Sequence, residues 1–233
     1  MKYRWSPAPP QPVLADFLAK QLEISPLLAQ CLLNRGLSEP EPITRFLEPR
    51  LKNLADPFLL PNMAAAVDRL FAARENSEPL VIFGDYDVDG VTSTTLLTEV
   101  LTALGWQVHS YLPHRMDEGY GLSQSGVENC LEKFPVKLLL AVDCGSTAVA
   151  QIDWLRARGV EVIVLDHHQV STPPPNAVAL VNPQVGVQAL ASPLPGQPKG
   201  RTQTFTELCS AGLAFKLAHA LVKRGRELPP FAD

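Results

Sequence analysis

Hydrophobic and polar positions follow two different spacings along the chain. Before residue 75 the apolar residues recur at helical spacing, in segments at 13–22, 26–35, 38–47 and 62–74. Ser38 is placed to cap the third of these helices, with Glu41 completing a capping box, and Asn62 is placed to cap the fourth. The first part of the chain, residues 1–60, is therefore predicted to be a small helical segment.

After residue 79, short apolar runs alternate with amphipathic segments. The runs predict strands at 80–83, 107–112, 137–142 and 160–165, with a weaker candidate at 177–181. The intervening segments predict helices at 90–104, 123–131, 147–158 and 207–224. This alternation indicates an α/β fold over residues 61–233, a Rossmann-like parallel sheet with helices on both faces. Residues 184–203, rich in Gly, Pro, Ser and Gln, are predicted to form a flexible loop.

Composition narrows the classes of function. The 233 residues carry 20 Lys and Arg against 24 Asp and Glu, which argues against a module that holds nucleic acid by bulk positive charge. A nuclease whose metal ions supply the local positive charge stays open. The cysteines form no CxxC pair, and there is neither a signal-peptide h-region nor an apolar run of membrane-spanning length. We therefore expect a cytoplasmic protein that does not bind membranes.

Acidic and imidazole side chains follow three of the predicted strands. They are Asp85, Asp87 and Asp89 after the first strand, Asp143 after the third, and Asp166, His167 and His168 after the fourth. Ligands of an open parallel sheet bind beyond the carboxyl ends of its strands, so these turns should converge. Carboxylates gathered there repel one another unless cations neutralise them. Carboxylates with an imidazole suit Mg²⁺ or Mn²⁺, and the imidazole favours Mn²⁺.

Simpler explanations exist for the single pieces of this pattern. Asp85 to Gly90 matches the opening of an EF-hand loop, but the twelfth position is Leu96 rather than Glu and a strand precedes the loop, so that interpretation fails. Asp89 is equally well explained as the N-cap of the following helix or as a ligand. Asp143 alone would be a turn residue. The histidine pair is harder to dismiss, because turns do not require imidazoles, and the three turns together indicate a functional site.

These motifs resemble those of the DHH phosphoesterase superfamily. The first is Gly84-Asp-Tyr-Asp-Val-Asp-Gly-Val-Thr-Ser, the second Asp143-Cys-Gly-Ser, and the third Asp166-His-His, which names the family. The segment Leu208-Cys-Ser-Ala-Gly and the tripeptide Val181-Asn-Pro are similar to the RecJ branch of single-strand-specific 5′-exonucleases, which act in DNA repair and recombination. The resemblance covers nearly the whole chain.

The resemblance implies a role for each matching residue. Asp85, Asp87, Asp143 and His167 would bind a pair of Mn²⁺ or Mg²⁺ ions, and Asp143 with its two oxygens is the candidate bridge. His168 would lie beside the ions or meet the scissile phosphate, and Asp166 would fix a histidine tautomer. Some relatives have an additional histidine ligand two positions before Asp85, where this chain has Phe83.

Single-stranded DNA is the partner that the resemblance implies, together with replication or repair proteins. Arg115 could pair with a phosphate, His114 lies beside it, and Tyr120 could stack on a base, although packing in the core is the favoured account of Tyr120. A solvated side chain is the favoured account of Lys216.

Other functions stay open within and outside the enzyme class. They are a phosphodiesterase for short oligonucleotides or cyclic dinucleotides, a manganese pyrophosphatase, and a non-catalytic replication scaffold. Relatives supply one further metal aspartate from a later strand, and they carry a second phosphoesterase domain and an OB-like domain. We expect these to lie beyond Asp233, so that the chain is a fragment that could bind metal without turnover when isolated. Its 5′→3′ polarity is implied by the resemblance alone.

Overall fold

The computed structural model describes residues 6–185 and 205–227, which form two compact units divided between Ala55 and Asp56. The division lies a few residues before the domain boundary predicted at residue 60, which stays a prediction. Among the described residues, every helix is too short or too polar to cross a bilayer. The predicted loop at 184–203 lies almost wholly outside the described residues.

The first unit consists of short helices, α1 (Pro12–Leu22), α2 (Pro26–Leu33) and α3 (Pro40–Leu47), and the 3-10 turn η1 (Leu51–Asn53). A proline opens each α-helix, where its missing N–H costs no hydrogen bond. Leu18 and Ile43 are among the residues of its small apolar core. The predicted cap at Ser38 is wrong, because α3 begins at Pro40 behind Glu39 and has no side-chain cap.

The second unit alternates helices and strands. Its elements are η2 (Pro57–Leu59), α4 (Met63–Glu75), β1 (Leu80–Phe83), α5 (Val88–Ala103), β2 (Val108–Tyr111), α6 (Arg115–Glu118), α7 (Gln124–Lys133), β3 (Leu138–Val142), α8 (Val149–Ala157), β4 (Glu161–Leu165), β5 (Ala179–Val181) and α10 (Ser210–Gly225). The described strands form one parallel sheet in the order β2-β1-β3-β4-β5. The predicted fold class is confirmed.

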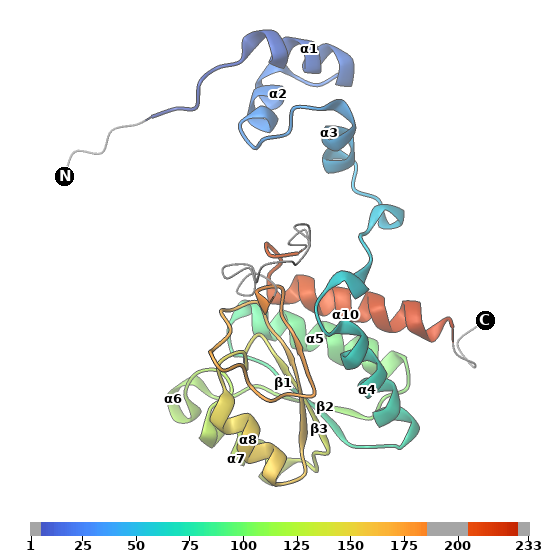
Figure 1. Ribbon diagram of the computed structural model, residues 1–233, viewed down its shortest axis with the longest axis vertical. Helices are drawn as coiled ribbons and strands as arrows, with labels where there is room; N and C mark the ends of the chain where they lie inside the picture. The colour runs from blue at the N-terminus through green and yellow to red at the C-terminus, as the bar shows by residue number, and fades with distance from the viewer. Residues whose placement is uncertain (1–5, 186–204, 228–233) are drawn as a thin grey trace, which may run out of the picture. The chain divides into compact units, whose positions relative to one another are not determined.

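Two apolar layers enclose this sheet, because successive side chains of a strand point to opposite faces. Leu80 and Ile82 of β1 pack with α4, α5 and α10, whereas Val81 and Phe83 pack with α7 and α8. Figure 1 shows the first group of helices on one side of the sheet and the second group on the other. With both faces covered, the polar ends of the strands are left for chemistry.

The order of the strands explains where a site can form. From β1 the chain crosses to β2 on one side and later returns to β3 on the other side. Such a switch point opens a crevice between the carboxyl ends of the two central strands. The turns after β1 and β3 carry Asp85 and Asp143, and the turn after β4 carries Asp166.

Candidate metal centre

The turn after β1 is closed tightly by a glycine. A Cβ atom on Gly90 would lie 2.4 Å from the carbonyl oxygen of Asp85, so only glycine fits. The carboxylate of Asp87 caps α5 by accepting hydrogen bonds from the N–H groups of Asp89 (3.0 Å) and Gly90 (2.9 Å). Asp85 is fully buried, and its Oδ1 accepts from the N–H of Tyr86 at 2.7 Å.

Asp89 has a different role from the one that its position suggested. The N-cap of α5 is Asp87, so the cap alternative for Asp89 is wrong, and its alternative role as a ligand stays a prediction. Its carboxylate instead accepts from the N–H groups of Ser210 (2.9 Å) and Ala211 (3.0 Å), the first residues of α10. Burial opposes the charge, but these bonds and one from Cys209 hold the pKa of Asp89 below its ordinary value.

Asp143 lies at the centre of the site in a left-handed backbone conformation, with φ +63°. Its Oδ1 accepts a hydrogen bond of 2.7 Å from the hydroxyl of Ser210. Burial raises the pKa of Asp143 to about 7 and the charges of Asp87 and Asp89 act in the same direction, whereas the Ser210 bond opposes them. Without a cation, this carboxyl is therefore only partly ionised near neutral pH.

The turn after β4 is organised around Asp166, which is only 1% exposed. Its Oδ1 accepts from the N–H groups of His167 (2.8 Å) and His168 (3.2 Å) and lies 2.7 Å from Nδ1 of His168, while Oδ2 accepts from the N–H of Ser146 (3.1 Å). Although burial raises it, these bonds lower the pKa of Asp166. A proton on Nδ1 of His168 would bond to Asp166 and leave Nε2 as the other ring nitrogen, and the predicted tautomer role of Asp166 stays a prediction.

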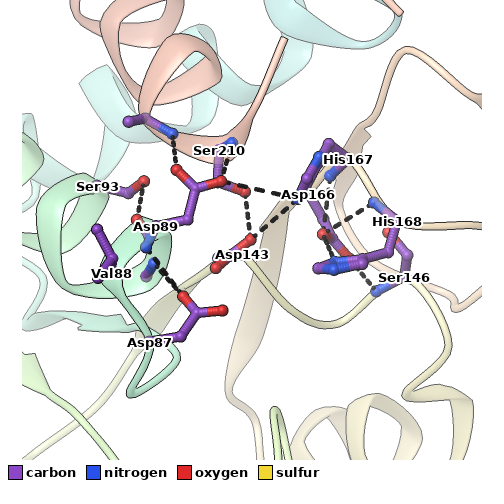
Figure 2. Close-up of polar contacts among 12 residues, drawn as sticks. Asp87, Val88, Asp89, Ser93, Asp143, Ser146, Asp166, His167, His168 and Ser210 are labelled. Atoms are coloured by element: carbon purple, nitrogen blue, oxygen red, sulfur yellow. Dashed lines mark hydrogen bonds and ion pairs between the residues drawn. The ribbon is translucent and has the colours of Figure 1, made fainter. Parts of the chain in front are cut away.

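The three turns meet, as Figure 2 shows. Nε2 of His167 lies 3.4 Å from Oδ1 of Asp143 and 3.8 Å from Oδ2 of Asp89. Asp143, His167 and His168 each offer one ligand atom within 4.8 Å of the others. Although burial lowers it, contact with Asp166 and the charges of Asp143 and Asp85 raise the pKa of His168.

The donor set fits a divalent cation. Oδ2 of Asp85 is buried with no hydrogen-bond partner among the described residues, which is costly for a carboxylate. Burial, followed by the charge of Asp87, raises the pKa of Asp85. Crowded oxygen ligands beside an imidazole, with one buried oxygen left over, are the donors that Mg²⁺ or Mn²⁺ would satisfy. Phe83 packs instead in the α7 layer, where its ring stacks on Tyr111.

The residues predicted to contact DNA lie on and beside α6. The guanidinium of Arg115 lies 5.0 Å from the centre of the Tyr86 ring, and His114 pairs with Asp117 at 2.7 Å. Tyr120 is 61% exposed, so its predicted packing in the core is wrong. Desolvation and the charges of Asp85 and Asp143 raise the pKa of Tyr120 to about 12.

Several residues that shape the site were not predicted. Ser210 and Ser146 bond to the acidic turns, as described above, and buried Asn182 donates to the Ser146 hydroxyl and to the carbonyl of His168, both at 2.8 Å. Ser210 lies within Leu208-Cys-Ser-Ala-Gly and Asn182 within Val181-Asn-Pro, the two short segments that resemble the RecJ branch. That resemblance was the sequence signal that could have identified them. Lys216 was predicted to be solvated but is buried, with its ammonium 4.6 Å from the centre of the Phe205 ring.

Comparisons with known proteins agree with this geometry. Residues 79–232 match the family described as DHH family, N-terminal domain. The single-stranded-DNA-specific exonuclease RecJ of Bacillus subtilis (strain 168) is 37% identical over 221 residues, and RecJ of Thermus thermophilus is 38% identical over 215. These matches cover 95% and 91% of this chain but 26% and 28% of those proteins. The chain thus spans about a quarter of the length of the curated relatives that it matches.

Two solved structures of RecJ exonucleases also match this chain. A crystal structure of exonuclease RecJ bound to manganese matches with a TM-score of 0.59 and 36% identity, over 75% of this chain and 41% of that one. The crystal structure of RecJ from Thermus thermophilus in complex with Mn²⁺ matches with a TM-score of 0.66 and 32% identity, over 95% of this chain and 28% of that one.

Proposed function

Because this chain belongs to the DHH family, we propose that it is the metal-binding catalytic part of a phosphoesterase that hydrolyses single-stranded DNA from its 5′ end. The observation that carries the proposal is the group of potential ligand atoms on Asp143, His167 and His168, which lie within 4.8 Å of one another. The unpaired, buried Oδ2 of Asp85 in the turn after β1 supports it. The RecJ matches favour a DNA substrate over other phosphoesters.

The proposed ligands of a Mn²⁺ or Mg²⁺ pair are Asp85, Asp87, Asp143 and His167. Divalent ions at such a site lower the pKa of bound water and neutralise charge that develops on the phosphoryl oxygens. Asp166 fixes the ring of His168 through Nδ1, and the raised pKa of His168 favours its cationic form. His168 is therefore suited to contact an anionic phosphoryl oxygen, and Asp143 to hold two ions with its two oxygens.

The surface beside the cluster suits a single strand. Tyr120 and Tyr86 meet edge to face at 6.0 Å, and Arg115 lies over Tyr86. Exposed aromatic rings can stack on unpaired bases, and a nearby guanidinium can pair with a phosphate. We assign these contacts to Arg115, His114 and Tyr120. Association with replication or repair proteins rests on the RecJ resemblance alone.

Substrate preference tests the proposal. The complete protein, loaded with Mn²⁺, is offered a long single strand labelled at its 5′ end, the same sequence as a duplex, a linear dinucleotide and pyrophosphate. We expect release of 5′ nucleotides from the single strand. Preferential cleavage of the dinucleotide or of pyrophosphate would instead identify a different phosphoesterase, and metal binding without any turnover would favour the scaffold.

Asp143→Ala tests the assignment of the ligands. Because this carboxylate is the proposed bridge, we expect Mn²⁺-dependent hydrolysis to fall by at least about 100-fold. Near-normal turnover would contradict the assignment. Asp153→Ala removes an exposed carboxylate of α8 and is the matched control, with unchanged turnover expected.

A further inference from the structure

The first turn of α10 touches the metal centre directly. Ser210 is fully buried, and its hydroxyl donates to Oδ1 of Asp143 although 67 residues separate the two in the sequence. Oδ1 is also the oxygen that faces Nε2 of His167. The serine hydroxyl therefore contacts the one carboxylate that the proposed ions would share.

Asp89 fixes the place of that hydroxyl. One of its carboxylate oxygens accepts the N–H of Ser210 and the other accepts the N–H of Ala211, so that Asp89 holds the start of α10 at two points. A carboxylate is favoured there because the N–H groups of the first helical turn lack partners within the helix. Figure 2 shows that the bonds of Asp89 and the bond between Ser210 and Asp143 meet at the beginning of α10.

We propose that Ser210 is a positioning residue of the metal centre, which orients the carboxylate of Asp143, and that Asp89 holds Ser210 in place. This inference rests on the proposed function. The backbone of Asp143 is held at φ +63°, which leaves its side chain free to rotate about χ1 and χ2. The 2.7 Å bond from Ser210 restrains this rotation and leaves the other lone pairs of the carboxylate for the ions.

A bond that served folding alone would behave differently from one that positions a ligand. Its loss would lower the stability of the metal-free chain and leave the Mn²⁺ affinity unchanged. Loss of a group that orients a metal ligand costs roughly 10- to 100-fold in metal affinity. The affinity of the intact 233-residue chain for Mn²⁺, measured by titration calorimetry, therefore separates the two roles.

Two variants remove the bond in different ways. Ser210→Ala deletes the donor, and we expect the Kd for Mn²⁺ to rise roughly 10- to 100-fold. Ser210→Cys keeps the bulk of the side chain but donates only weakly, so we expect a smaller rise in the same direction. The electron paramagnetic resonance spectrum of bound Mn²⁺ should change in both variants, because the carboxylate at the metal has moved.

Ser123→Ala is the matched control. It removes a hydroxyl that caps α7 by accepting the N–H of Gly126 at 3.1 Å, away from Asp143. We expect a lower melting temperature and an unchanged Kd for Mn²⁺. A metal-free thermal melt of each variant reports whether it folds, and the Cys variant serves if the Ala variant does not.

The proposal is overturned if Ser210→Ala binds Mn²⁺ within about twofold of the unmodified chain, or if Ser210→Cys binds as tightly as serine does, which would make packing the cause. Failure of the unmodified chain to bind Mn²⁺ would overturn the proposed metal centre itself, and this inference with it.

Discussion

The turn after β1 and the turn after β4 each bury one aspartate almost completely, with opposite electrostatic results. Asp85 is 0% exposed and Asp166 is 1% exposed. Burial acts against the charge of both, yet the pKa of Asp85 is raised and the pKa of Asp166 is lowered. The difference is in their partners, because Asp166 receives bonds on both oxygens and Asp85 on only one.

The comparison separates a carboxylate that holds the structure from one that is left for a ligand. A buried carboxylate with enough donors is stable as an anion within the protein alone. One with an unpaired oxygen becomes stable as an anion only when a cation arrives. Burial by itself therefore does not identify a metal ligand, whereas the buried oxygen without a donor makes Asp85 a candidate.

The largest expected effect comes from removing the charge of the satisfied aspartate. Asp166→Asn replaces one acceptor oxygen with an N–H₂ group that must face other donors, so we expect the free energy of unfolding of the metal-free chain to fall by about 3 kcal/mol. Urea unfolding at neutral pH measures it. Asp153→Asn, an exposed aspartate of α8, is the control and should change it by less than about 0.5 kcal/mol.

Asp85→Asn should have the opposite effect on stability. We expect the Mn²⁺ affinity to fall by at least about 100-fold, equivalent to about 2.7 kcal/mol. The metal-free chain should become more stable, because the raised pKa of Asp85 means that its charge opposes folding. Calorimetry and urea unfolding give the two quantities. A loss of metal-free stability like that of Asp166→Asn would remove the distinction between the turns.

The pH dependence sharpens the same contrast. Asp143 has a pKa raised from 3.8 to about 7, so between these values the folded chain keeps a proton that the unfolded chain has lost. The metal-free chain should therefore lose stability as pH rises through this window. Mn²⁺ must displace that proton, so its affinity should rise about tenfold per pH unit, or about 1.4 kcal/mol, and level off near pH 7. An affinity independent of pH from about 5 to about 7 would contradict this.

The smallest effect on stability is expected from a substitution that removes a support of the turn after β4. Asn182→Ala removes three hydrogen bonds of 2.8 Å, because the amide donates to the hydroxyl of Ser146 and the carbonyl of His168 and its oxygen accepts from the N–H of Gln184. We expect a loss of about 1 kcal/mol in stability. Because the turn after β1 is untouched, the pH dependence of Mn²⁺ binding should stay as it was. A changed pH dependence would show that the two turns are coupled.

Much of this arrangement could be predicted from local sequence. The strands were predicted within a few residues, because fully apolar runs mark strands buried on both faces. The convergence of the acidic turns followed from the parallel sheet, and α10 was predicted at its approximate place. The four-residue helix α6 was missed, since so short a helix has no periodicity.

The remaining features depend on partners that local sequence does not reveal. The role of Asp89 was predicted from the residues next to it in the sequence, but its carboxylate bonds to Ser210, 121 residues away. In the same way, Asn62 stands at the N-cap of α4 as predicted but makes no capping bond, because its amide donates to the carbonyl of Leu180. Short polar side chains suit both local caps and distant contacts, and only the fold decides between them.

The bond between Asp89 and α10 has a consequence for the order of events during synthesis. A ribosome has to release the chain beyond Gly225 before α10 can dock, long after the turn after β1 has emerged. Until then Asp143 lacks its hydroxyl partner. During synthesis we therefore expect the bond between Ser210 and Asp143 to form only after the strands of the sheet have emerged, so that the proposed metal centre is ordered late.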